Sequence, residues 1–328
     1  MLRKGSLAVI LGVAAILVAS LVNSSFAGNS YVARMEIITF QSTTLTDQEI
    51  LNGKKEGKPV TLAGELRLPP SGSARLPAVI LLHGSGGISG YVTDWEQDLN
   101  ALGVATFVID CFKGRGIVNT NNDQSQLGRL SMIVDAYRAL DVLAKHPRID
   151  SNRIAIMGFS RGGQAALYSS MKRIQQVYGP ANVQFAAYII FYPDCGTTYK
   201  SDDEVADQPI RIYHGTADDY NPIAPCRLYV ARLKSKGKDV QMTEYDGAVH
   251  VFDWQGFKKP VKMEKAQTVR SCQLAEAQDG VIVNAKTNKP FTYADPCVEL
   301  GPTVRYDEKA ATESRKAVDE FVTATLKP

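Results

Sequence analysis

The sequence predicts a doubly wound α/β fold built on a mostly parallel β-sheet. From residue 78 onward, short apolar runs rich in β-branched residues alternate with segments that have the apolar periodicity of helices. Several of these runs are almost wholly apolar, as expected of parallel strands that are covered on both faces. A repeated strand–helix–strand order joins such strands through right-handed crossovers, so helices are expected on both faces of the sheet.

The first two strands are expected to form an antiparallel pair at one edge of the sheet. They lie at 33–40 and 60–69, with turn-forming residues at 52–58 between them. Six further strands are expected at 78–82, 105–109, 153–157, 185–191, 210–213 and 240–245. Helices are expected at 93–102, at 127–146, directly after Ser160 and at 226–237.

The C-terminal part adds two elements to this alternation. Residues 272–297, with a cysteine at each end, are expected to form an excursion that contains a hairpin. Residues 307–326 are expected to form a last helix, because Asp307 and Glu308 suit its first turn. No internal repeat or linker interrupts the pattern, so residues 28–328 are expected to form a single domain.

The N-terminus has the features of a signal peptide. Arg3 and Lys4 precede an uncharged apolar run, and Ser25 and Ala27 supply the small residues of a cleavage site. We expect residues 1–27 to be removed and the protein to be exported, to the periplasm or the medium. A retained membrane anchor is the alternative.

Composition excludes several classes of partner and cofactor. Loss of Arg3 and Lys4 leaves 35 basic against 34 acidic residues, a net charge of +1. This balance provides no basic surface for nucleic acid and none for anionic membranes. The five cysteines form no C-x-x-C pair, and no histidine lies near enough in sequence to suggest a zinc site, so no metal is expected.

Residues 158–162 have the sequence Gly-Phe-Ser-Arg-Gly and join a predicted strand to a predicted helix. In such an elbow the residues two before and two after the serine approach each other, so both must be glycine. The turn lifts the serine hydroxyl clear of the sheet, and the N–H of Arg161 can donate to a developing oxyanion. We expect Ser160 to be a nucleophile; the alternative is a glycine-rich turn with an incidental serine.

A serine hydroxyl needs a positioned base, and the sequence offers four histidines. His146 precedes a proline at the end of a predicted helix, where a surface or capping role is expected. His83 and His214 each end a strand and are expected to brace turns. His250 follows the last predicted strand, and it alone fits the serine–acid–histidine order that accompanies this elbow. We expect His250 to be the base; the alternative is a packed side chain.

The base needs an acid that fixes its tautomer. Asp218 is expected in this role, because its loop follows the strand next to the one that precedes His250. Asp219 is expected to be solvated or to cap the turn. Asp194, at the end of the preceding strand, is the more remote alternative.

A second oxyanion donor is expected from the glycine-rich loop after the first parallel strand. Its candidate is the backbone N–H of Ser85, and the alternative is a flexible turn. This loop and the serine elbow both open at the carboxyl ends of strands, where open α/β sheets place their sites.

Taken together, these motifs resemble the dienelactone hydrolase family of α/β-hydrolases, more closely its exported members with a serine nucleophile. The resemblance runs from about Val60 to the last helix and rests on residues 81–87, 94–116, 146–163, 214–222 and 246–253. It implies an α/β-hydrolase type of sheet and the hydrolysis of small-molecule esters or lactones without metal or organic cofactor. This chain departs from the namesake enzymes in two places. They have a cysteine where Ser160 stands, and a glutamate where this chain has Gly84 or its neighbours.

The same fold implies a pairing of the cysteines. The strands ending at 191 and 213 are neighbours in it, so a disulfide Cys195–Cys226 is expected, and Cys272–Cys297 would close the excursion. Cys111 is left single and is expected to be buried or to line a pocket, rather than to be reactive.

The candidate substrate-binding residues are assigned by their loops. They are Trp95, Phe112, Tyr192 and Trp254, each of which could equally lie in the core, together with Arg115, for which a structural role is at least as plausible. The expected function is that of an exported serine hydrolase acting through an acyl-enzyme. An amidase, peptidase or acyltransferase with the same triad, and a non-catalytic binding protein that keeps the fold, are the alternatives.

Overall fold

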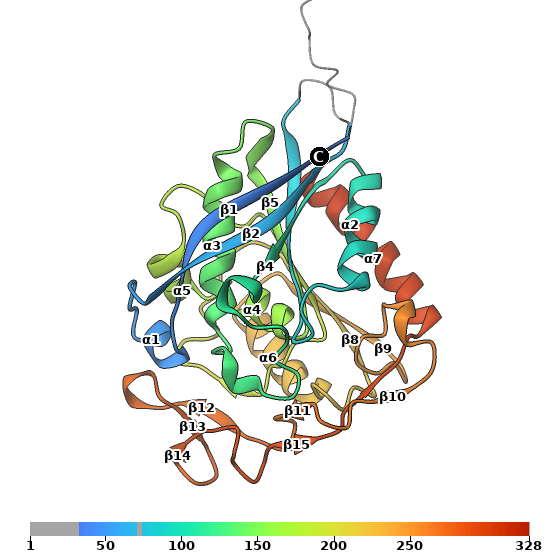
Figure 1. Ribbon diagram of the computed structural model, residues 1–328. Coiled ribbons are helices and arrows are strands. Elements are labelled where there is room, and N and C mark those ends of the chain that lie inside the picture. The colour runs from blue at the N-terminus through green and yellow to red at the C-terminus, as the bar shows by residue number, and fades with distance from the viewer. Residues whose placement is uncertain (1–32, 71–73, 328) are drawn as a thin grey trace, which may run out of the picture.

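A central sheet organises the molecule (Figure 1). The computed structural model describes residues 33–70 and 74–327. The strands of the sheet are β1 Arg34–Thr44, β2 Lys58–Leu68, β3 Leu76–Leu82, β4 Ala105–Asp110, β5 Ile149–Phe159, β6 Tyr188–Phe191, β8 Ile210–Gly215 and β9 Val240–Tyr245. Their order is β1-β2-β4-β3-β5-β6-β8-β9. The six strands from β3 onward in this sheet are parallel, whereas β2 is antiparallel to both β1 and β4. The predicted fold class and its antiparallel pair are confirmed.

Alternation along the central strands places apolar side chains on both faces of the sheet. In β3, Ala78, Ile80 and Leu82 belong to one hydrophobic core, whereas Val79 and Leu81 belong to the other. Because successive side chains of a strand point to opposite faces, an unbroken apolar run supplies two cores at once.

Helices cover the two faces unequally. They are α1 Asp47–Leu51, α2 Gly90–Ala101, α3 Ser131–Ala144, α4 Arg161–Tyr168, α5 Lys172–Tyr178, α6 Ile223–Ser235 and α7 Glu308–Leu326. Helices α2 and α7 lie on one side of the sheet, and α3, α4, α5 and α6 lie on the other (Figure 1). The apolar side chains of the first pair belong to one core and those of the other four helices to the second core. Four 3₁₀ turns lie in the described loops: η1 Lys113–Arg115, η2 Gln124–Gln126, η3 Gln255–Phe257 and η4 Gln278–Gly280.

The connection between β1 and β2 differs from the prediction. The sequence predicts only a turn at 52–58, but helix α1 precedes it. Thr46 caps this helix, accepting a hydrogen bond from the N–H of Glu49, whose carboxylate accepts in turn from the Thr46 N–H. This capping box, Thr-x-x-Glu, is legible in the sequence and explains why so short a helix forms.

The C-terminal excursion lies at the lower edge of the molecule in Figure 1. Strands β12 Leu274–Glu276 and β13 Ile282–Asn284 form its hairpin, with β14 Lys289–Pro290 on one side and β7 Thr197–Thr198 on the other. Short pairs β10 Val261–Lys262 with β16 Thr303–Val304, and β11 Gln267–Thr268 with β15 Glu299–Leu300, connect it to the body.

Two disulfides stabilise this region. Cys272–Cys297 closes the excursion, and Cys195–Cys226 links the loop after β6 to α6. Both pairs agree with the predicted ones. Cys111 is free and buried, and burial raises the pKa of its thiol well above the usual value, so the thiolate is disfavoured.

The predicted signal peptide, residues 1–27, lies outside the described residues. Within the part of the chain that the structure describes, no helix has the length and apolar character needed to cross a membrane.

Candidate active site

The serine elbow connects β5 to α4. Ser160 has φ 53° and ψ −115°, a strained conformation that non-glycine residues rarely adopt. A Cβ on Gly158 would lie 2.1 Å from the carbonyl oxygen of Gly162. A Cβ on Gly162 would lie 2.3 Å from the carbonyl oxygen of Leu82, at the end of β3. The two glycines therefore allow the close approach that leaves Ser160 half-buried at the carboxyl end of the sheet.

Ser160, His250 and Asp218 form a continuous hydrogen-bonded chain. The Nδ1–H of His250 donates to Asp218 Oδ2 at 2.7 Å, and Nε2 lies 2.9 Å from Ser160 Oγ. Asp218 Oδ1 accepts from the N–H groups of Tyr220 and Asn221, at 2.8 and 2.9 Å. The carboxylate is thus fixed by three donors and holds the imidazole in the tautomer whose Nε2 can accept the serine proton.

Two aromatic rings pack against the imidazole. The rings of Tyr192 and Tyr220 each lie 4.7 Å from that of His250, centroid to centroid. The hydroxyl of Tyr192 donates to Asp253 Oδ1 at 2.7 Å, and the indole N–H of Trp95 donates to Asp253 Oδ2, also at 2.7 Å. Burial raises the pKa of Asp253. Sequence reasoning missed Asp253, although it lies only three residues after His250.

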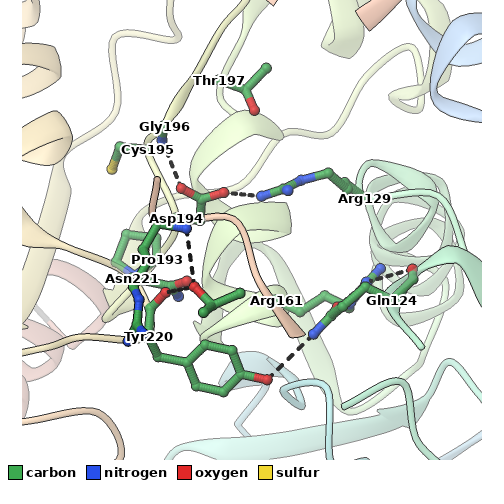
Figure 2. A network of polar contacts seen from close by, with 12 residues as sticks. Gln124, Arg129, Arg161, Pro193, Asp194, Cys195, Gly196, Thr197, Tyr220 and Asn221 are labelled. Atoms are coloured by element: carbon green, nitrogen blue, oxygen red, sulfur yellow. Dashed lines mark hydrogen bonds and ion pairs between the residues drawn. The ribbon is translucent and has the colours of Figure 1, made fainter. Parts of the chain in front are cut away.

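The other candidate acids lie elsewhere. Asp194 forms an ion pair with Arg129 and accepts from the N–H of Gly196 at 2.7 Å (Figure 2). Asp219 accepts from the N–H of Thr303 at 2.7 Å and pairs with Arg270 at 3.3 Å. Neither is hydrogen-bonded to His250. The side chain of Asp219 is 41% exposed, as expected of a solvated residue, and it also binds the C-terminal segment through Thr303 and Arg270.

The other candidate bases also have separate partners. His83 and His214 are buried, and Nδ1 of each lies within hydrogen-bonding distance of the carbonyl of the following glycine, at 2.8 and 3.1 Å. Both brace turns, as predicted. His146 lies 3.3 Å from Glu36 at the far edge of the sheet.

The two predicted oxyanion donors lie beside the elbow. Arg161 is the first residue of α4, and the N–H groups of Ser85 and Arg161 have no acceptor within the described chain. Gly84 brings the loop after β3 close to the nucleophile, since a Cβ there would lie 3.4 Å from Ser160 Cβ. This arrangement leaves two backbone donors available near the serine.

Two cavities meet at Ser160. The first, here called the aromatic cavity, has a volume of about 240 Å³, and both Ser160 and His250 line it. Its apolar wall is formed by Tyr91, Phe159, Tyr192, Trp254, Phe257 and Met263. The second, here called the polar cleft, has a volume of about 30 Å³, and Ser160 also lines it. Its wall includes Gln124, Arg129, Arg161, Gln164, Asp194 and Tyr293.

Only some of the predicted substrate-binding residues line a cavity in the structure. Tyr192 and Trp254 line the aromatic cavity. Trp95, Phe112 and Arg115 line neither cavity, which corrects their assignment. Trp95 faces the core from α2, and Phe112 packs its ring 4.4 Å from that of His83. Arg115 is buried in an ion pair with Asp135 at 2.8 Å, so its charge is already compensated.

Sequence reasoning did not find the residues of the polar cleft. Arg129 and Gln124 lie between β4 and α3, Gln164 on α4 and Tyr293 in the excursion. No motif joins these segments. Within residues 33–70 and 74–327, no cluster of three or more His, Cys, Asp or Glu side chains could hold a metal ion.

A comparison with protein-family models decides the family. The model of the dienelactone hydrolase family matches residues 63–275, well over half of the chain. This chain belongs to the dienelactone hydrolase family. It is thus a member of a family of α/β-fold hydrolases, as the motifs predict.

Proteins to which this chain is similar have names that denote different activities. A Bradyrhizobium protein, named a probable 2-oxo-3-(5-oxofuran-2-ylidene)propanoate lactonase, is 26% identical over 202 residues, covering 58% of this chain and 80% of the relative. A dienelactone hydrolase-like promiscuous phosphotriesterase from metagenomic libraries superposes with a TM-score of 0.54 at 17% identity, over 89% of this chain and 98% of that one. Propionate-bound esterase 2 of Thermogutta terrifontis superposes with a TM-score of 0.52 at 17% identity, over 82% and 92% of the two chains. The structural likeness shows the fold.

Proposed function

We propose that this protein is a serine hydrolase that cleaves a carboxylic ester or lactone through an acyl-enzyme. The observation that carries the proposal is the hydrogen-bonded chain from Asp218 through His250 to Ser160, with distances of 2.7 and 2.9 Å. Lactonase and esterase activities named among its relatives support the same class of substrate.

The reaction begins with the serine hydroxyl. Ser160 Oγ attacks the carbonyl carbon while His250 Nε2 accepts its proton, and Asp218 stabilises the imidazolium that forms. The N–H groups of Ser85 and Arg161 hold the oxyanion. His250 then returns the proton to the departing alkoxide, which leaves as an alcohol and leaves Ser160 acylated.

Water completes the cycle. It attacks the acyl carbon while His250 takes one of its protons. When the second oxyanion collapses, the bond to Ser160 Oγ breaks, His250 returns that proton to Oγ, and the carboxylic acid is released. No cofactor has a role in this sequence of steps.

Export is part of the proposal. Two disulfides, Cys195–Cys226 and Cys272–Cys297, are compatible with an oxidising compartment outside the cytoplasm. We propose that residues 1–27 direct the chain there and that residues 28–328 form the single catalytic domain.

Substitution of the triad tests the mechanism. With benzyl acetate as substrate, Ser160→Ala and His250→Ala should lower kcat by a factor on the order of 10⁴ or more, and Asp218→Asn by about 10³ or more, because each removes part of one proton-transfer unit. Asp219→Asn is the matched control and should retain kcat within about threefold, since Asp219 bonds to Thr303 and Arg270 instead. Near wild-type turnover by folded His250→Ala would remove that residue from the mechanism.

A further inference from the structure

The two cavities that meet at Ser160 face different parts of an ester. Ser160, Ser85 and Tyr220 line both of them, but His250 and Val251 line the aromatic cavity. The base that removes the serine proton must return it to the departing oxygen, so the alcohol portion of the substrate lies on the side of His250. The acyl portion is then directed towards the polar cleft.

The aromatic cavity suits an apolar alcohol that carries a ring. Its volume is about 240 Å³, and an apolar cavity of about 150 Å³ is sufficient to bind benzene. The Trp254 indole in its wall packs against two glycines, since a Cβ on Gly90 or Gly256 would lie 2.8 or 2.4 Å from it. The absence of a Cβ at these two glycines therefore gives the large Trp254 side chain room to lie in the cavity wall.

The polar cleft carries an uncompensated positive charge. Arg129 is paired with Asp194, but Arg161 has no carboxylate partner within the described chain (Figure 2). Its guanidinium donates to neutral acceptors instead, including the carbonyl of Leu127 at 2.9 Å and that of Gln124 at 3.1 Å. Burial lowers the pKa of Arg161. An uncompensated buried charge is costly, and an anion in the cleft would remove that cost.

Two hydrogen-bond donors in the cleft are also unused. Arg129 Nε and Gln164 Nε2 are buried and have no partner within the described residues. Both side chains line the cleft and are more than nine-tenths buried, with 7% and 3% exposed. Buried donors without acceptors are rare in folded proteins, so this pair points to an acceptor on the ligand. At about 30 Å³, the cleft has room for a group of carboxylate size and not for a long acyl chain.

We propose that the enzyme hydrolyses monoesters of short dicarboxylic acids. The free carboxylate of the acyl portion binds Arg129 Nε and Gln164 Nε2 in the polar cleft, in the field of Arg161, while a ring-bearing alcohol occupies the aromatic cavity. This inference rests on the proposed function and adds the substrate class to it.

Matched esters test the acyl side. Rates of benzyl alcohol release are compared for two groups of esters. Three carry a free carboxylate: monobenzyl malonate, monobenzyl succinate and monobenzyl glutarate. Two are neutral: benzyl methyl succinate and benzyl butyrate. The best monoester should exceed both neutral esters at least tenfold in kcat/KM. Gln164→Met and Arg129→Lys, which keeps the charge opposite Asp194 but removes Nε–H, should each reduce this preference at least fivefold. Gln175→Met, an equivalent change on α5, should leave it unchanged.

The alcohol side has its own comparison. Monobenzyl succinate should exceed monomethyl succinate at least tenfold in kcat/KM, and Trp254→Ala should reduce that ratio. Hydrolysis of the neutral esters without preference for a monoester would overturn this inference and leave the proposed function intact. Failure to cleave any ester, together with failure of a fluorophosphonate to label Ser160, would overturn both.

Discussion

Glycine, more than serine, determines the geometry of the elbow. Gly158 and Gly162 approach backbone atoms so closely that a Cβ on either would come within 2.3 Å of a carbonyl oxygen. Ser160 itself has a positive φ of 53°. Ser160 keeps this strained backbone conformation because β5, α4 and the end of β3 fix the backbone around it.

Gly158→Ala should therefore be much more destabilising than an alanine elsewhere in the site. We expect a loss of at least about 3 kcal/mol in the free energy of unfolding, because neither the added methyl group nor the backbone it meets can move away. Gly86→Ala is the control, since its Cβ would have only the Asn121 amide nitrogen nearby, at 3.7 Å. Urea unfolding of the two variants measures the difference, and equal stabilities would contradict this explanation of the turn.

Individual residues of the site differ in how far the sequence could predict them. The sequence alone predicts that three side chains lie close together, those of Ser160, Asp218 and His250. Each of them follows a strand, and the carboxyl ends of parallel strands meet at one edge of the sheet. Arg129 and Gln164 could not, since they come from segments whose spacing carries no motif. For a related reason, the sequence could not decide whether Trp95 lines a pocket or lies in the core. A tryptophan next to a predicted loop gives no sign of which face of its helix it occupies.

At the scale of elements, the regular strands were the most predictable part of the structure. A short apolar run such as β3 favours a strand, because buried helices are longer than such a run and parallel strands are buried on both faces. Helix α1 was missed, since a single turn has no periodicity and only its capping box indicated it. The excursion was predicted as a hairpin, but its place beside the polar cleft depends on long-range pairing between β12 and β7.

The excursion provides a prediction about its disulfide. Cys272–Cys297 closes a segment with a sequence separation of 25 residues, within which Tyr293 lines the polar cleft. The double variant Cys272→Ala/Cys297→Ala should lose about 3 kcal/mol in the free energy of unfolding, because the unfolded chain regains the entropy of the open loop. Denaturant unfolding measures this loss. A variant as stable as the wild-type protein would mean that the excursion is held by its other contacts.

At the scale of the whole molecule, two buried histidines link stability to pH. Both His83 and His214 are fully buried, and burial lowers the pKa of each below its usual 6.5. Below pH 6.5 the unfolded chain binds protons that the folded chain does not, so stability falls as the pH falls from that value. Above it both forms are neutral and this contribution is constant.

The expected slope is up to about 1.4 kcal/mol per pH unit for each histidine. Urea unfolding between pH 5 and 8 measures it, and His214→Gln should reduce the slope below pH 6.5 by the share of one histidine. His214 is suited to this test because it is fully buried and its Nδ1 lies 3.1 Å from the carbonyl oxygen of the adjacent Gly215. An unchanged slope in the variant would show that His214 is protonated in the folded protein.

The central claim is that Ser160 is the nucleophile activated by His250, and covalent labelling tests it most directly. The purified protein is treated with a fluorophosphonate, and intact mass and peptide mapping locate the adduct. The result predicted here is one adduct per chain, on the peptide that contains Ser160, absent from Ser160→Ala and formed far more slowly by His250→Ala. An adduct on another residue, or none on the folded wild-type protein, would contradict the account.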